Sequence, residues 1–145
     1  MRTVLQRVRE ARVRVAGEVV GEIGSGLLAL VGVAPEDGAD QARATAHKLR
    51  HLRVFDDGSG RMNLDVRQAE GGVLVVSQFT LAADARRGRR PSFSAAASPE
   101  HARAVILLLV AELEALGVPV AQGRFGAAMQ VELVNDGPVT FLLEV

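Results

Sequence analysis

The sequence predicts a single α/β domain over residues 1–145, with a mostly antiparallel sheet and two main helices. A length of 145 residues suits one domain with a sizeable core. Hydrophobic residues form 48% of the chain, which excludes a disordered class. The apolar pattern also alternates between extended runs typical of strands and two stretches with helical spacing. Because aromatic residues make up only 3%, we expect an aliphatic core.

Three strands are predicted at the start of the chain. Residues 2–15 have an extended pattern, and residues 12–15 alternate as in a half-exposed strand. A second strand is expected over 19–23, followed by a turn at 24–26. Residues 27–33 form a continuous apolar run, which is typical of a strand buried on both faces. We expect these three strands to form a meander.

Two helices are predicted from apolar spacing and from end signals. Pro35–Gly38 breaks the third strand and opens a helix that should end near Arg53. Ser98 is a suitable N-cap for the second helix, with Pro99 at its first position and Gly117 at its C-terminal end. The apolar stripes are Ala42, Thr45, Ala46, Leu49 and Leu52 in the first helix, and Ala102, Val105, Ile106, Leu109, Leu113 and Leu116 in the second.

The remaining strands are expected to be shorter. The last two should form a hairpin with the Gly137-Pro138 bond at its tip, because proline cannot donate a ladder hydrogen bond. Spacing alone favours the trans form of this bond, since only about 5–6% of X-Pro bonds in folded proteins are cis. Residues 86–98 should be a long irregular segment, and segments of this length are usually functional or mobile. The expected strands cover 63–66, 73–77, 118–121, 130–134 and 139–145.

Composition excludes several kinds of function. The chain has no cysteine, which excludes disulfides, thiolate metal sites and a cysteine nucleophile. Its start is a charged strand pattern rather than a signal peptide. No segment approaches the roughly 20 apolar residues of a membrane helix. We therefore expect a cytoplasmic protein with no membrane contact.

Charge limits the possible nucleic-acid partners. The formal net charge is zero, which argues against a large phosphate footprint, and we expect no DNA partner. Arginine is nevertheless concentrated on both sides of Gly88, at Arg86, Arg87, Arg89 and Arg90. This cluster fits either a solvated loop or a small patch that contacts phosphate.

Few residues suggest side-chain catalysis. His47 and His51 can share a helix face, but two ligands do not make a zinc site, and we expect neither a metal nor a cofactor. Ser77 and Thr80 lie at the end of the predicted strand 73–77. A hydroxyl nucleophile needs a neighbouring base, and no histidine motif supplies one, so spacing alone favours structural roles. Acyl transfer at this position would depend on backbone N–H donors.

Several motifs, taken in order, resemble the D-aminoacyl-tRNA deacylase family. Each run is weak evidence by itself, but their ordered combination over essentially the full length is specific. The main runs are Ser77–Leu81, Gly88–Phe93 and Asn135–Thr140; the supporting runs are Met1–Val8, Gly17–Gly24, Lys48–Arg50 with Arg53–Phe55, Arg61–Leu64 and Phe125–Ala127 with Met129.

The resemblance implies a fold, a reaction and a partner. The fold would be the barrel-like, two-helix fold of that family, and the protein would be a homodimer. The enzyme would hydrolyse the ester that joins a D-amino acid to the 3′ end of tRNA, with possible extension to mischarged glycyl-tRNA. Gly137 and Pro138 would be joined by a cis bond and would enter the partner's site. Their carbonyls would bind the substrate's amino group and leave no room for an L side chain.

The resemblance also implies the site residues. Ser77, Gln78, Phe79 and Thr80 would form the catalytic pocket, which holds the ester carbonyl and stabilises the developing oxyanion. The 2′-hydroxyl of the terminal adenosine would help to activate water, and Thr80 would position the substrate. Further substrate-binding residues would be Phe125 and Met129, which would border the adenine, and Arg7, as structural support or as a tRNA contact.

One departure and two alternatives remain. Ala82 stands where family members commonly have an aromatic residue, which leaves the amino-acid preference open. The absence of an independent catalytic constellation is also compatible with a non-catalytic module that binds RNA ends or proteins. A hydrolase of small D-aminoacyl esters that acts through Ser77 or Thr80 is the other alternative.

Overall fold

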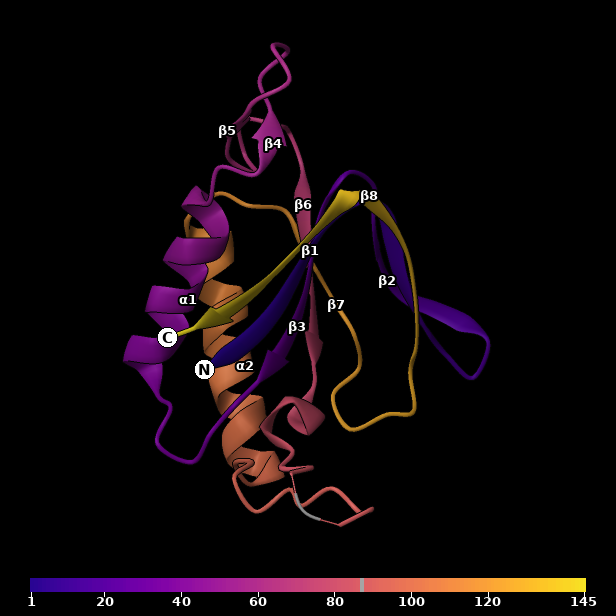
Figure 1. The fold of residues 1–145 in the computed structure, drawn as a ribbon, viewed down its shortest axis with the longest axis vertical. Coiled ribbons are helices and arrows are strands. Elements are labelled where there is room, and N and C mark those ends of the chain that lie inside the picture. Colours follow the sequence, from indigo (N-terminus) through magenta and orange to yellow (C-terminus); the bar gives the residue numbers. More distant parts are fainter. Residues whose placement is uncertain (87) are drawn as a thin grey trace.

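The computed structural model describes residues 1–86 and 88–145, so Arg87 of the predicted arginine cluster lies outside the described residues. The two long helices lie together on one side of a strongly twisted sheet, and the two chain termini are neighbours (Figure 1). In chain order the elements are β1 (Arg2–Val15), β2 (Glu18–Ile23), β3 (Gly26–Gly32), α1 (Ala39–His51), β4 (Phe55–Asp56), β5 (Met62–Leu64), β6 (Gly72–Ser77), the 3₁₀ turn η1 (Phe79–Ala82), α2 (Pro99–Ala115), β7 (Val120–Gln122) and β8 (Gln130–Glu144).

The first three strands form one long hairpin rather than the expected meander. β2 pairs with the second half of β1, starting at Val15 opposite Glu18. β3 pairs with the first half of the same strand, ending at Arg2 opposite Gly32. The predicted turn at 24–26 is therefore wrong, because the chain bends there but continues along β1 in the same direction. The length of β1 explains the difference, since one strand offers partners to both β2 and β3.

The predicted C-terminal hairpin is also wrong. β8 is one strand that runs antiparallel to β1 along nearly its whole length, from Gln130 opposite Arg14 to Glu144 opposite Arg2. Gly137 and Pro138 lie in a bulge of this strand, between the pairs formed by Asn135 and Thr140. The turn-like residues of this segment therefore form a β-bulge, and the residues on both sides of the bulge pair with β1.

The rest of the sheet is parallel and brings the barrel close to closure. β3 pairs with β6, and β6 pairs with β7, both in parallel. β7 then approaches β2 so closely that a Cβ atom on Gly21 would lie 2.2 Å from the carbonyl oxygen of Gln122. Antiparallel pairs still form most of the sheet, as expected. β4 and β5, of which the sequence predicts only the second, form a separate small hairpin.

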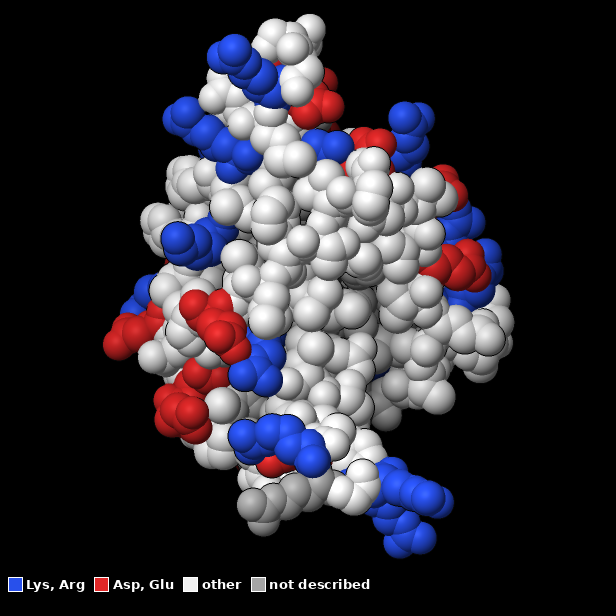
Figure 2. Space-filling view, in the orientation of Figure 1, with Lys and Arg blue, Asp and Glu red and all other residues white. Residues whose placement is uncertain are grey.

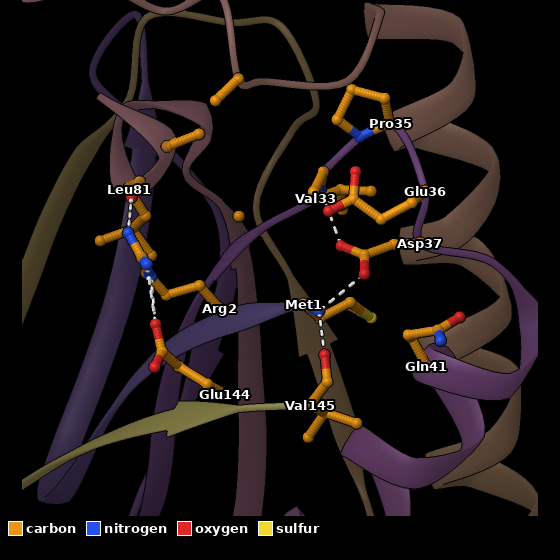
Figure 3. A pocket seen from close by; sticks show the side chains of 14 residues that line it. Met1, Arg2, Val33, Pro35, Glu36, Asp37, Gln41, Leu81, Glu144 and Val145 are labelled. Carbon is orange, nitrogen blue, oxygen red and sulfur yellow. Dashed lines mark hydrogen bonds and ion pairs between the residues drawn. The ribbon is translucent and has the colours of Figure 1, made fainter. Parts of the chain in front are cut away.

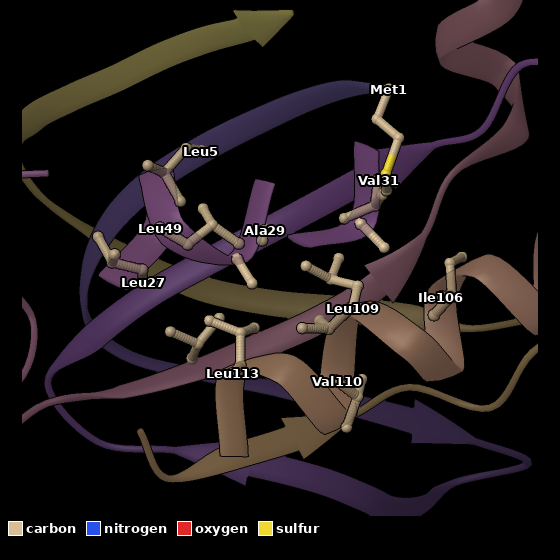
Figure 4. Close-up of a cluster of buried hydrophobic side chains, with 14 of the residues drawn as sticks. Met1, Leu5, Leu27, Ala29, Val31, Leu49, Ile106, Leu109, Val110 and Leu113 are labelled. Atoms are coloured by element: carbon tan, nitrogen blue, oxygen red, sulfur yellow. The ribbon is translucent and has the colours of Figure 1, made fainter. Parts of the chain in front are cut away.

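Two aliphatic cores lie on the two faces of the sheet, as expected for strands buried on both faces. Alternate residues of β3 and β6 face the helices, and the residues between them face β2, β7 and the first part of β8. Figure 4 shows the helix side, where Leu27 and Ala29 of the sheet meet Leu49 of α1 and Leu109 of α2. Leu28 on the other face is equally inaccessible to solvent.

The helix ends agree with the sequence prediction. The Ser98 hydroxyl accepts a hydrogen bond from the backbone N–H of His101, and Pro99 opens α2. Gly117 follows the helix with φ +75°, a conformation that glycine adopts without a steric penalty. α1 ends at His51, two residues before the predicted end.

Candidate functional site

A cavity of about 370 Å³ lies at the carboxyl end of β6, between the sheet and the start of α2. Ser77, Gln78 and Phe79 of the predicted catalytic pocket line it, together with Phe125, which the resemblance assigns to the adenine. Most of the remaining wall is apolar. The structure therefore brings four of the predicted site residues together around one cavity.

The pairing of β6 with β3 fixes the position of these residues. Val31 pairs with Ser77, and the backbone N–H of Gln78 then donates to the Val31 carbonyl at 2.7 Å. The chain turns directly into η1, in which the N–H of Leu81 donates to the Gln78 carbonyl at 3.1 Å. This turn presents the first residues of η1 at the edge of the cavity.

The turn also leaves hydrogen-bonding groups available. The side-chain amide of Gln78 donates to the Thr80 hydroxyl. The hydrogen bonds of the described residues provide no acceptor for the backbone N–H groups of Phe79 and Thr80. Thr80 itself is exposed and does not line the cavity, but it contacts the cavity wall through Gln78.

Two aromatic rings stand at the mouth of the cavity. Phe79 is 58% exposed, an unusual position for a large apolar side chain. Its ring meets the ring of Phe93 edge to face, with the centroids 5.1 Å apart. Phe93 is not among the predicted site residues. Its place in the motif Gly88–Phe93 is the sequence feature that could have indicated a role at the site.

The bulge that contains Gly137 and Pro138 is exposed and does not line this cavity. The peptide bond between them is cis. Asn135 stabilises the bulge because its side-chain oxygen accepts a hydrogen bond from the backbone N–H of Val139 at 2.8 Å. Gly137 has φ +150°, and a Cβ atom there would lie 2.5 Å from Cγ2 of Val139.

Arg7 lies behind this bulge rather than in the cavity. Its side chain is buried and donates from Nε to the Asp136 carbonyl at 2.9 Å and from Nη1 to the Val54 carbonyl at 2.6 Å. In this chain Arg7 therefore supports the backbone next to Gly137. Met129 also lies outside the cavity, packed beside Gly123 and the second core.

A larger cavity of about 550 Å³ lies at the chain termini (Figure 3). The amino group of Met1 donates to the Asp37 carboxylate at 2.7 Å, and the Arg2 guanidinium pairs with Glu144. None of the predicted catalytic or substrate-binding residues lines this cavity. Ala82, the departure noted above, lies on its wall.

Part of the predicted arginine cluster is neutralised locally. Arg86 donates two hydrogen bonds to the carboxylate of Asp84, at 2.9 and 2.8 Å. These bonds lower the pKa of Asp84 and raise that of Arg86. Arg89 and Arg90 are exposed and take part in none of the ion pairs that the structure describes.

The surface around β8 carries exposed apolar side chains as well as ion pairs with β1, such as Arg2 with Glu144 and Arg14 with Glu132. Charged side chains gather at the rim of the face seen in Figure 2, and its centre, where β8 crosses β1, is largely uncharged. The exposed large apolar side chains of the C-terminal segment are Leu133, Val134, Phe141, Leu142 and Val145. Several exposed large apolar side chains on one strand and its end are a feature of interaction sites.

The described residues contain no group of three or more histidine, cysteine, aspartate or glutamate side chains that could hold a metal ion. Among the same residues, no helix has the length and apolarity needed to cross a membrane. No histidine lines the cavity at β6. The fold and this site define a single-domain α/β protein whose pocket is built from a turn after a parallel strand, backbone amides and aromatic rings.

Comparisons with known proteins identify the family. Residues 4–144 match the profile of the family described as D-Tyr-tRNA(Tyr) deacylase. The chain is 58% identical over 145 residues to a D-aminoacyl-tRNA deacylase of Pseudomonas putida and 56% identical to one of Deinococcus radiodurans, with full coverage of both chains in each case. The chain belongs to the D-aminoacyl-tRNA deacylase family, a family of hydrolases, as the sequence motifs predicted.

Solved structures support the same fold. A protein named c-Myc DNA Unwinding Element Binding Protein superposes with a TM-score of 0.94 at 38% identity, covering 100% of this chain and 99% of the other. A probable eukaryotic D-amino acid tRNA deacylase superposes with a TM-score of 0.87 at 17% identity, covering 99% and 98%. The predicted fold class is therefore confirmed.

Proposed function

We propose that this protein hydrolyses the ester bond of D-aminoacyl-tRNA and so releases the free D-amino acid and tRNA. The observation that carries the proposal is the single cavity at which Ser77, Gln78, Phe79 and Phe125 meet, in a chain that matches the family over its full length. The aromatic and aliphatic wall suits the adenosine end of tRNA. The polar groups of the turn after β6 suit the ester.

The proposed chemistry depends on backbone groups rather than on a side-chain nucleophile. The N–H groups of Phe79 and Thr80 are available to donate hydrogen bonds to an oxyanion. Thr80 and Gln78 form a hydrogen-bonded pair that would hold the substrate carbonyl in place. Aminoacyl esters are activated, so a positioned water assisted by the 2′-hydroxyl of the terminal adenosine can complete the hydrolysis.

We propose that the active form is a homodimer in which the bulge of one copy reaches the cavity of the other. Gly137 and Pro138 are exposed, they lie outside the cavity of their own chain, and the strand that carries them also exposes large apolar side chains. The carbonyls of Gly137 and Pro138 would bind the substrate's amino group. The close backbone would exclude an L side chain.

The test compares D-tyrosyl-tRNA with L-tyrosyl-tRNA at enzyme concentrations well below substrate. We expect repeated turnover of the D ester and little release from the L ester. Binding of the D ester without turnover would instead support a non-catalytic module that binds RNA ends. Sedimentation of the same sample tests the dimer, since a monomer that hydrolyses the D ester would contradict the shared site.

Two variants of Thr80 separate the proposal from a side-chain mechanism. Thr80→Ser retains a hydroxyl and Thr80→Ala removes it. We expect Thr80→Ala to keep measurable activity, because Thr80 positions the substrate in this proposal. Complete loss in Thr80→Ala with full activity in Thr80→Ser would favour a hydrolase that acts through that hydroxyl.

The scope of the activity needs separate substrates. Glycyl-tRNA has no side chain for the bulge to exclude, and we propose that the enzyme also hydrolyses it.

We propose no DNA partner, because the formal net charge is zero. Excess single-stranded DNA should therefore leave the hydrolysis rate unchanged at physiological salt. A cytoplasmic location follows from the proposed tRNA substrate, and cell fractionation tests it.

A further inference from the structure

A second, smaller groove with both polar and apolar lining residues adjoins the cavity at β6. It has a volume of about 210 Å³, and it shares Ser77, Ile106 and Phe125 with the first cavity. Its lining includes Arg103 from α2 and Arg124 from the loop after β7. The sequence gives no motif for this pair, because the two arginines are 21 positions apart and on different elements.

The two guanidinium groups are not used to stabilise the fold. Both side chains are exposed, and neither takes part in an ion pair or a side-chain hydrogen bond among the described residues. No aspartate or glutamate lines the groove. Two arginines that converge on a groove without a carboxylate form a site for an anion, and the planar guanidinium suits phosphate in particular.

The chemistry of the proposed substrate places an anion next to the cavity. In an aminoacyl-tRNA the ester and the 5′-phosphate are carried by the same ribose, that of the terminal adenosine. If the ester lies at Ser77 and the adenine lies against Phe125, the ribose is at the boundary that the two cavities share. Its 5′-phosphate then lies within one sugar of that boundary.

We propose that Arg103 and Arg124 bind the phosphodiester that links the terminal adenosine to the preceding nucleotide. The inference rests on the proposed function, since it takes the ester to be bound at Ser77. This contact would recognise a polynucleotide end rather than a nucleoside, and it would favour tRNA over small D-aminoacyl esters. It also explains how a chain with zero net charge holds RNA, because the positive charge is concentrated at one phosphate.

The test uses two minimal substrates that differ by one phosphodiester. The first is the D-tyrosyl ester of adenosine, and the second is the D-tyrosyl ester of the dinucleotide cytidylyl-(3′→5′)-adenosine. We expect the double variant Arg103→Ala/Arg124→Ala to lower kcat/KM about tenfold on the dinucleotide ester, mainly through KM, and to change kcat/KM on the adenosine ester by less than about twofold. The salt dependence on the dinucleotide should become shallower, by about 0.7 in the log–log slope for one phosphate.

The matched control is Arg61→Ala, which removes an exposed arginine near the β4–β5 hairpin, at the opposite end of the molecule from η1 (Figure 1). It should leave both substrates unchanged. The double variant Arg103→Lys/Arg124→Lys keeps the charge and should recover part of the loss. An equal loss on both esters, or no loss on the dinucleotide ester, would overturn the proposal.

A binding measurement separates this proposal from the proposed function. The dinucleotide cytidylyl-(3′→5′)-adenosine without an attached amino acid should bind the wild-type protein about tenfold more tightly than adenosine does, and the double alanine variant should lose this difference. If the wild type hydrolyses no D ester but retains this binding difference, the proposed reaction fails and the phosphate site stands. If it hydrolyses the esters but binds both ligands equally, the phosphate site fails.

Discussion

Arg7 gives the most direct test of how the sheet supports the bulge of β8. The change Arg7→Met keeps most of the aliphatic stem and removes two hydrogen bonds, to the carbonyls of Val54 and Asp136. A hydrogen bond from a charged donor contributes about 1.5–3 kcal/mol. The substitution also removes the unfavourable burial of a charge, which offsets part of the loss. We therefore expect Arg7→Met to lower the free energy of unfolding by about 3 kcal/mol.

Arg9 is the matched control, because it contacts the same aspartate from the same strand. Its Nε lies 3.3 Å from the Asp136 carboxylate, but its side chain is 76% exposed, whereas that of Arg7 is 8% exposed. Exposed ion pairs contribute about 0.2–1 kcal/mol. Arg9→Met should therefore lower the free energy of unfolding by less than about 1 kcal/mol.

The assay is urea unfolding at one fixed protein concentration, since association would couple stability to concentration. A second measurement is the hydrolysis of D-tyrosyl-tRNA at a temperature at which both variants are folded. We expect Arg7→Met to lower this activity, because Arg7 positions the backbone next to Gly137. The reasoning is refuted if Arg7→Met is no less stable than Arg9→Met.

Three other predictions follow from the same structure. Gly137→Ala should reduce D-ester hydrolysis while the fold survives, because its Cβ atom would meet Val139. The control is Gly58→Ala, at φ +86° with open space around it, which should lower the free energy of unfolding by about 1 kcal/mol and leave the activity intact. Steady-state kinetics and urea unfolding test both variants. Leu109→Ala should lower the free energy of unfolding by about 2–5 kcal/mol, because Leu109 is fully buried between the helix and the sheet; a loss below about 1 kcal/mol would contradict the packing seen. Burial raises the pKa of Asp65, but hydrogen bonds from the Gln68 backbone and from Arg50 outweigh this effect and lower the pKa overall. The ionised carboxylate therefore stabilises the fold at pH values above its ordinary pKa of about 4. The stability advantage of the wild type over Asp65→Asn should disappear as the pH falls below that value, and urea midpoints between neutral and acidic pH test this.

Much of the core could be predicted from local pattern alone. The run 27–33 has no polar alternation, and this is the direct consequence of having one core on each side of β3. The ends of α2 were predicted equally well, since Ser98, Pro99 and Gly117 act on backbone groups within a few residues. In both cases the residues that determine the local structure lie within or next to the segment that adopts it.

The errors concern strand pairing, which depends on distant residues. Asn135–Thr140 has the composition of a turn, and a local interpretation predicts chain reversal there. The structure instead pairs both flanks with β1, more than 100 positions away, and the turn residues form a bulge. The turn expected at 24–26 is wrong for the same reason, because only the length of β1 shows that β2 and β3 share one partner.

The site shows the same division between local and distant information. The resemblance indicates Ser77–Thr80 as a unit, whereas spacing alone favours structural roles for Ser77 and Thr80. In the structure one turn after one strand positions all four residues. Phe125 is brought to them from a loop almost 50 positions later, and the resemblance rather than any periodicity indicated its role. Arg103 and Arg124 could not be found from the sequence, since their significance lies in a groove that exists only after α2 and β7 have packed.

The central position of β1 explains why the proposed active site requires two copies of the chain. One edge of β1 pairs with β3, and β3 in turn positions β6 and the cavity at Ser77. The other edge pairs with β8, which carries Gly137 and Pro138. A bulge and a cavity that are fixed to opposite edges of one strand cannot approach each other without breaking the sheet. Under the proposed function, the bulge can therefore act only on the cavity of a second copy, and the exposed apolar side chains of β8 are where that copy would bind.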